Sequence, residues 1–146
     1  MTVKVINKSS NELPAYAKPG DAGLDVKANE MVVLKEGETA VVGTGLYVEV
    51  PPGYEMQVRS RSGLAAKYSV AVLNSPGCID SGFRGEVKVI LHNYGPPDEQ
   101  HRWFVIRPGD RIAQLVLCPV FQVEWIESNE LEETERGDEG FGSTGM

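Results

Sequence analysis

The sequence has 146 residues, is 41% hydrophobic, and carries 14 basic against 21 acidic residues, a net charge of −7. This length fits one domain, and the composition can supply a core. Residues 127–146 hold seven acids and one base, a net of −6, so the remaining residues carry −7 − (−6) = −1. An acidic tail on a near-neutral body argues against duplex nucleic acid, which rewards clustered Lys and Arg. A small polyanion remains possible, because local Arg side chains and backbone N–H groups can bind it.

The N-terminal residues contain no apolar signal segment, and no apolar run approaches the ~18 residues of a membrane span. We therefore expect a cytoplasmic protein, or one inside a host cell if the source is a virus. Cys78 and Cys118 are too few for a disulfide framework. We expect both to be reduced, buried thiols.

Short apolar runs, separated by turns rich in Gly and Pro, predict an all-β chain folded as a sandwich or barrel. One short helix is expected, with Ser62 capping residues 64–67. Residues 127–146 are polar and glycine-rich, so the division is a body of residues 1–126 and a flexible arm of residues 127–146. The predicted strands are residues 3–6, 31–34, 39–42, 46–50, 54–59, 70–73, 86–92, 103–106, 112–120 and 122–126.

The sequence contains a dinucleotide-binding pattern and two histidines, but the surrounding residues do not support either kind of site. Residues 140–145 spell the G-x-G-x-x-G dinucleotide motif, but only Met146 follows, so the required helix cannot form. His92 and His101 are too few for a zinc site, which needs three or four ligands.

Two segments have the composition of a phosphate or metal site. Residues 59–63 (RSRSG) combine cations, hydroxyls and a glycine at the predicted helix start, which suits a phosphate; a capped helix with a solvated Arg pair explains them equally well. Asp21 and Asp25 could serve magnesium, which takes one or two carboxylates, although turn chemistry is the more common role for such acids.

Three further segments could carry chemistry. Asp80 lies between two glycine-bearing turns, where it could orient a water as a general base or simply form an Asx-turn. Asp110 and Arg111 lead into an apolar strand and could pair at the surface. Residues 136–145 combine an Arg, an aromatic ring, two hydroxyls and four glycines, which favours closure over a ligand rather than a linker.

Together these segments resemble the trimeric dUTP diphosphatases, whose five signature motifs occur here in order. The resemblance extends from about residue 13 to residue 145. The motifs are residues 21–25 (DAGLD), 61–65 (RSGLA), 77–85 (GCIDSGFRG), 109–115 (GDRIAQL) and 136–145 (RGDEGFGSTG).

The resemblance implies a jelly-roll-type β-barrel and a homotrimer in which all three subunits contribute to each active site. It implies hydrolysis of dUTP to dUMP and pyrophosphate with Mg²⁺, which limits uracil in DNA and supplies dUMP for thymidylate synthesis. Asp80 should activate the attacking water, and Asp25 should meet the metal through water. The positions that match substrate contacts are Arg61, Ser62, Gly63, Asn74, Cys78, Ile79, Phe83, Lys88, Gln114, Arg136, Phe141, Gly142, Ser143 and Thr144.

In that family, Asn74 and the backbone at Cys78 and Ile79 correspond to the uracil-recognising positions, and Phe83 to the ring beside the deoxyribose. The phosphate contacts map to Arg61, Ser62, Gly63 and Gln114, with Arg136, Ser143 and Thr144 added from the arm, while Phe141 maps to the ring that stacks on uracil.

The sequence departs from the family twice: Phe83 stands where relatives usually have Tyr, and Glu139 where they often have Gly. The ring at Phe83 is kept, so only contacts through the hydroxyl are lost. A second acid beside Asp138 is expected to weaken closure of the arm.

Two alternatives are considered. A dCTP deaminase needs a catalytic glutamate ten residues after the hairpin aspartate, and that position is Ile90, which cannot move a proton. A nucleotide-gated interaction protein would bind dUTP, change the order of its tail and signal to a partner, and the presence of Asp80 argues against a purely binding protein.

Overall fold

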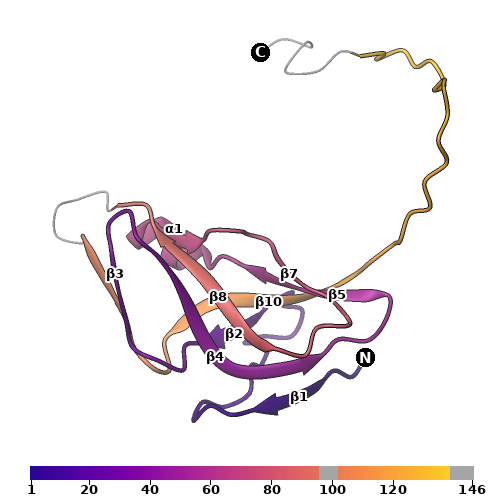
Figure 1. Ribbon diagram of the computed structural model, residues 1–146. Helices are drawn as coiled ribbons and strands as arrows, with labels where there is room; N and C mark the ends of the chain where they lie inside the picture. The colour runs from indigo at the N-terminus through magenta and orange to yellow at the C-terminus, as the bar shows by residue number, and fades with distance from the viewer. Residues whose placement is uncertain (96–101, 139–146) are drawn as a thin grey trace.

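The computed structural model describes residues 1–95 and 102–138, and within them the chain is built of short strands and one short helix, α1 (Ser62–Tyr68). Figure 1 shows the strands wrapped into one body, from which the chain leaves after the last strand. The strands are β1 (Lys4–Asn7), β2 (Leu24–Lys27), β3 (Val32–Lys35), β4 (Thr39–Glu49), β5 (Tyr54–Arg59), β6 (Val70–Val72), β7 (Gly77–Ile79), β8 (Glu86–Asn93), β9 (Trp103–Ile106) and β10 (Arg111–Pro119).

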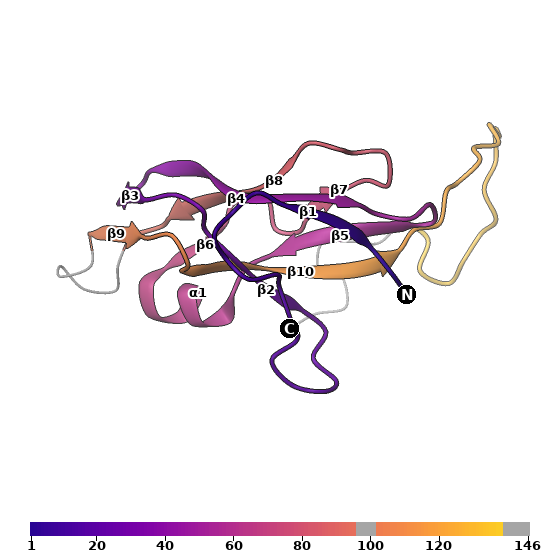
Figure 2. The same ribbon diagram turned by 90° about the horizontal axis from the view of Figure 1, so that it is seen from below.

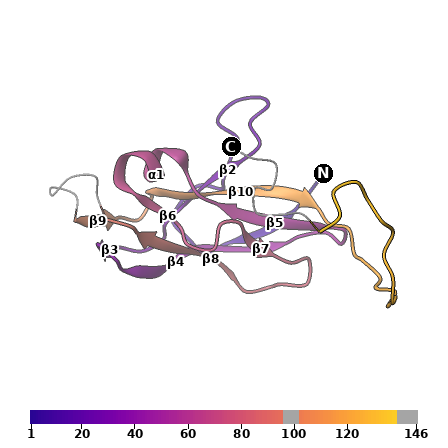
Figure 3. The same cartoon turned by 90° about the horizontal axis from the view of Figure 1, so that it is seen from above.

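Every strand pairs antiparallel with its neighbours. One four-stranded sheet has the order β1-β4-β8-β6, a second has the order β2-β10-β5-β7, and β3 pairs with β9. Seen edge-on, α1 and the β3–β9 pair lie at one end of the body, and the chain leaves β10 at the other (Figures 2 and 3). The expected all-β, jelly-roll-type fold with one short helix is confirmed.

The core lies between the sheets and follows the two-residue period of a strand. In β8, Val87, Val89 and Leu91 are buried, while Lys88 between them is exposed. This alternation is the reason that β8 can contribute to both the core and a surface pocket. No helix among the described residues is long and apolar enough to cross a membrane.

The structure corrects several predicted elements. The two predicted strands at residues 39–42 and 46–50 are one strand, β4, which ends at Glu49 and has a register shift between Gly43 and Tyr47. The short strands β2 and β7 were not predicted, since three or four residues carry too little pattern to be recognised.

The strand predicted for residues 122–126 is wrong. This segment has no strand beside it within the described chain, and Trp125 and Ile126 are 89% and 88% exposed. Apolar alternation alone cannot form a strand, because its backbone N–H and C=O groups require a partner.

Candidate functional site

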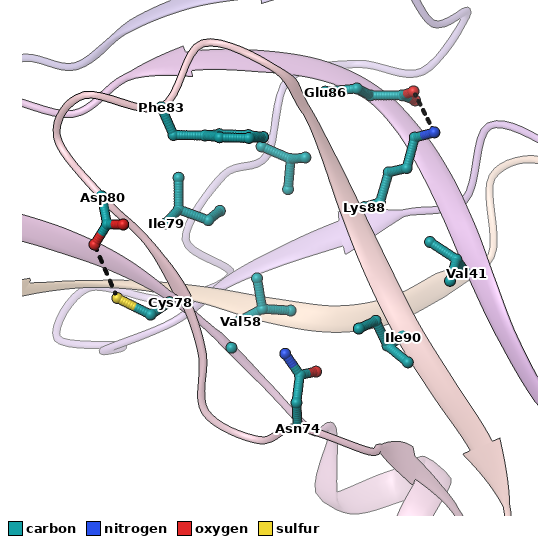
Figure 4. A pocket seen from close by; sticks show the side chains of 12 residues that line it. Val41, Val58, Asn74, Cys78, Ile79, Asp80, Phe83, Glu86, Lys88 and Ile90 are labelled. Carbon is teal, nitrogen blue, oxygen red and sulfur yellow. Dashed lines mark hydrogen bonds and ion pairs between the residues drawn. The ribbon is translucent and has the colours of Figure 1, made fainter.

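A pocket of about 320 Å³ opens beside the hairpin between β7 and β8 (Figure 4). It brings together six residues that the sequence singles out on chemical or family grounds. The lining residues are Val41, Val58, Asn74, Gly77, Cys78, Ile79, Asp80, Phe83, Glu86, Val87, Lys88 and Ile90. In Figure 4, Asn74 enters from one end, Asp80 stands at the other, and aliphatic side chains lie between them.

Two glycines shape this hairpin pocket by allowing close approaches. A Cβ built on Gly85 would lie 2.5 Å from Cζ of Phe83, so only glycine permits the ring to lie there. A Cβ on Gly77 would lie 3.1 Å from Nδ2 of Asn74. Phe83 is 44% exposed, which leaves apolar surface accessible at the mouth of the pocket.

Asp80 is exposed at the end of β7. Its turn is closed by the backbone, through the Phe83 N–H and the Asp80 carbonyl oxygen at 3.1 Å. The carboxylate therefore does not need to close the turn, and its Oδ1 lies 3.5 Å from Sγ of Cys78. This geometry leaves the carboxylate accessible to a water molecule.

The Cys78 thiol is exposed, contrary to the prediction of a buried cysteine, because it points outward between the buried Gly77 and Ile79. The thiol donates to the Glu55 carboxylate, which, with burial and Asp80 adding to the effect, raises the pKa of Cys78 to about 12. The same hydrogen bond lowers the pKa of Glu55. Cys118 is half-buried, and both cysteines are free.

The far wall of the pocket is provided by β8. Lys88 lines this wall, and its ammonium group lies 3.7 Å from the Glu86 carboxylate. Ile90, at the position where a deaminase would need glutamate, is part of the wall and offers no titratable group.

A second, charged group of side chains surrounds Asp25 on β2. Its Oδ1 accepts from Nε of Arg61 at 3.1 Å and from Nε2 of Gln114 at 3.3 Å, while Oδ2 accepts from Nη1 of Arg111 at 3.1 Å. Side-chain exposure is 19% for Asp25 and 21% for Arg61. We call Asp25, Arg61, Arg111 and Gln114 the cationic cluster, since two cations surround one anion and leave a net positive charge.

The hydrogen bonds near the cationic cluster show which partners Asp21, Asp110 and Arg111 have. Asp21 is a turn residue, whose Oδ2 accepts from the Lys18 N–H at 2.8 Å. Asp110 accepts from the Arg107 N–H at 2.8 Å, so the surface pair of Asp110 with Arg111 is wrong. Arg111 instead reaches Asp25, a contact across 86 positions that local sequence cannot reveal.

The helix start beside this cluster differs from the prediction. The N-cap is Arg61 in an extended conformation, no side chain caps the helix, and Ser62 is the first helical residue. Ser62 cannot cap because its own backbone is already helical. The Arg61 carbonyl accepts from the N–H groups of Leu64 and Ala65, both at 3.1 Å, while Ser62 and Gly63 are exposed.

Pocket and cluster are separate within one chain. The cavity that contains Arg61 and Arg111 is lined by a different set of described residues from the hairpin pocket. Arg136 is exposed in the segment after β10, and Phe141, Gly142, Ser143 and Thr144 lie outside the described residues. Sequence reasoning named Arg111 but not its contact with Asp25, and it did not single out Glu55, because both contacts depend on strand pairing.

The donor set of the cationic cluster suits magnesium only through water. Carboxylate oxygens are suitable ligands for this hard cation, but both oxygens of Asp25 already accept hydrogen bonds from cationic or amide groups. A metal ion that arrives with phosphate oxygens and water ligands fits this carboxylate better than a bare ion.

Comparison with known proteins agrees with this geometry. A family model described as dUTPase matches residues 9–145. The deoxyuridine 5'-triphosphate nucleotidohydrolases of Anaplasma marginale and Fusobacterium nucleatum are 48% and 49% identical, over 99% and 98% of this chain and 99% and 96% of their own. A Staphylococcus bacteriophage 80alpha dUTPase structure with dUpNHpp has a TM-score of 0.89 at 31% identity, covering 99% of each chain. The chain therefore belongs to the dUTPase family.

Proposed function

We propose that this chain hydrolyses dUTP to dUMP and pyrophosphate, with the hairpin pocket holding the nucleoside and the cationic cluster holding the phosphates. The observation that carries the proposal is the hairpin pocket itself, which joins an amide, an aromatic ring and an accessible carboxylate in one cavity. The reaction limits uracil in DNA and supplies dUMP, and we place it in the intracellular compartment where deoxynucleotides are consumed.

The apolar pocket is suited to a pyrimidine ring. The Asn74 amide can both donate and accept a hydrogen bond, as the uracil edge requires, and backbone groups at Cys78 and Ile79 can complete the set. The aliphatic walls are formed by Val58, Ile79 and Ile90. A methyl group at C5 would have to displace this packed wall, which disfavours thymine.

Phe83 is suited to pack against the deoxyribose. Its ring is held over Gly85 and presents a free apolar face. A 2′-hydroxyl would meet this face without a hydrogen-bond partner, which disfavours ribonucleotides. Lys88 at the far wall is a further candidate for substrate contact.

Asp80 is the candidate general base. Its carboxylate would accept a proton from the water that attacks the α-phosphorus, and the bond from that phosphorus to the bridging oxygen of pyrophosphate would break. Accessibility and the lack of an ion pair to Asp80 among the described residues support this role.

The net positive charge of the cationic cluster is suited to the triphosphate. Arg61 and Gln114, with Ser62 and Gly63 at the adjacent helix start, would contact phosphate oxygens. Mg²⁺ would reach Asp25 through a water ligand and would offset charge on the phosphates as pyrophosphate leaves.

We place each complete site between subunits of a homotrimer. The separation of pocket and cluster in one chain supports this arrangement, because one nucleotide must touch both. Residues 127–146 would complete a neighbouring site, with Arg136, Ser143 and Thr144 on phosphates, Gly142 allowing backbone approach and Phe141 on uracil.

A pyrophosphate-release assay on the purified chain tests the proposal. We expect release from dUTP with Mg²⁺, and much slower release from UTP, dTTP and dCTP. Tight binding of dUTP without release would favour the nucleotide-gated interaction protein instead. Ammonia release from dCTP would favour a deaminase.

A further inference from the structure

The outward face of β5 carries a ladder of polar side chains at alternate positions, Glu55, Gln57 and Arg59. Arg59 donates through Nε and Nη2 to Oε1 of Gln57 at 2.9 and 2.6 Å. Gln57 in turn donates through Nε2 to Oε1 of Glu55 at 2.6 Å. One oxygen of Glu55 is therefore held by its own strand, and Oε2 is left to face β7.

On β7, Cys78 lies between two carboxylates. The register pairs Gln57 with Cys78 and Met56 with Ile79, so the next position along places Glu55 opposite Asp80. Like charges at opposite positions repel each other. The Cys78 thiol lies between them: its shorter hydrogen bond goes to Oε2 of Glu55, and a longer, weaker one of 3.5 Å goes to Oδ1 of Asp80.

The thiol has one proton and can donate it to only one carboxylate at a time. A hydrogen bond from the thiol to Asp80 would occupy an acceptor oxygen and weaken it as a base, because donors stabilise the charged carboxylate. Glu55 and Asp80 also line one cavity of about 530 Å³, so both carboxylates are within reach of water.

We propose that Glu55 is a positioning residue for the reaction: it accepts the main hydrogen bond of the Cys78 thiol, which limits the thiol to a long contact with Asp80 and leaves the Asp80 carboxylate available to the attacking water. This inference rests on the proposed role of Asp80 as the base. The pKa of Cys78, raised chiefly by its bond to Glu55, means that the proton stays on sulfur at neutral pH. Glu55 acts through Cys78 and does not contact the substrate.

A double-mutant cycle tests the inference with Glu55→Gln, Cys78→Ala and the combined variant. We expect Glu55→Gln to lower kcat for dUTP by about three- to tenfold at unchanged KM, since the thiol turns to Asp80. The combined variant should match Cys78→Ala alone in kcat, whatever the effect of Cys78→Ala itself, because no thiol remains to be redirected. Glu49→Gln, which alters an exposed glutamate paired with Lys4, is the matched control.

The inference would be overturned if Glu55→Gln lowered kcat equally in the wild-type and Cys78→Ala backgrounds. It would also be overturned if Glu55→Gln did not lower kcat at all. The variant Asp80→Asn separates failure of the proposed role of Asp80 from failure of the proposed role of Glu55. If that variant keeps its turnover, the proposed base is wrong; if it is inactive and the cycle is additive, only the role of Glu55 is wrong.

Alkylation provides a readout independent of turnover. Cys78 and Cys118 are the two cysteines of the sequence, so Cys118→Ser leaves Cys78 as the reporter. At about pH 8.5 the thiolate fraction sets the rate with iodoacetamide, and we expect Glu55→Gln to raise it about tenfold or more. An unchanged rate would show that Glu55 does not hold the thiol.

Discussion

Asp25 and Asp80 are the same residue type in opposite surroundings. Asp25 is 19% exposed, and its two oxygens accept hydrogen bonds from Arg61, Arg111 and Gln114. Asp80 is exposed, and its one described side-chain contact is a thiol at 3.5 Å. Both oxygens of Asp25 are engaged by side-chain donors, whereas the accessible carboxylate of Asp80 can contact a water molecule directly.

The two regions are also built differently. The cationic cluster is held together by side chains from β2, β10 and the start of α1, so its charges organise one another. The hairpin pocket is shaped by backbone, with Gly77 and Gly85 admitting Asn74 and Phe83. We therefore expect substitutions in the cluster to change stability and metal dependence, and substitutions in the pocket to change chemistry and selectivity.

The largest effect is expected from Asp80→Asn. The amide is nearly isosteric but cannot accept the proton of water, so kcat should fall by about 10²–10⁴-fold while dUTP binding persists. Single-turnover kinetics and a binding titration check this. Near-normal turnover of the variant would show that Asp80 is not the general base.

Removal of residues 135–146 should reduce turnover by about 10²-fold, since it deletes Arg136 and the remaining candidate arm contacts to phosphate and base. Stability should change little, because the described residues of this segment are exposed and belong to no sheet. Activity and thermal unfolding of the truncated chain measure both. A non-hydrolysable dUTP analogue with magnesium should also slow proteolysis of the arm in the full chain, whereas equal cleavage would contradict closure.

Phe83→Ala should mainly reduce selectivity. Loss of the ring opens space for a 2′-hydroxyl, so the preference in kcat/KM for dUTP over UTP should fall by about tenfold or more. The preference over dTTP, which depends on the aliphatic wall, should be retained. Equal loss of both preferences would show that the hairpin has collapsed rather than lost one contact.

Asp25→Asn should have the smallest effect on the chemical step. It removes a charged acceptor from Arg61 and Arg111, which should cost about 1–3 kcal/mol of stability. The magnesium concentration for half-maximal rate should rise about tenfold if the carboxylate meets the metal through water. Urea unfolding and a magnesium titration separate the two effects, and an unchanged titration would remove Asp25 from the metal site.

The sequence by itself determined the all-β class, the helix near residues 62–68 and the motif segments, because strand alternation, turn residues and motif spacing are local properties of the chain. It also identified six residues of the hairpin pocket, which lie within fifteen positions of one another, from Asn74 to Lys88. Compact segments of this kind leave a recognisable local signal.

Only the tertiary structure decided which charges meet. Arg111 reaches Asp25 across 86 positions, and Cys78 reaches Glu55 across 23, so neither contact has a local signature. The predicted strand at residues 122–126 was wrong for the same reason. A strand, an ion pair or a thiol hydrogen bond requires a partner, and the partner is chosen by the packing of distant segments rather than by the residues beside it.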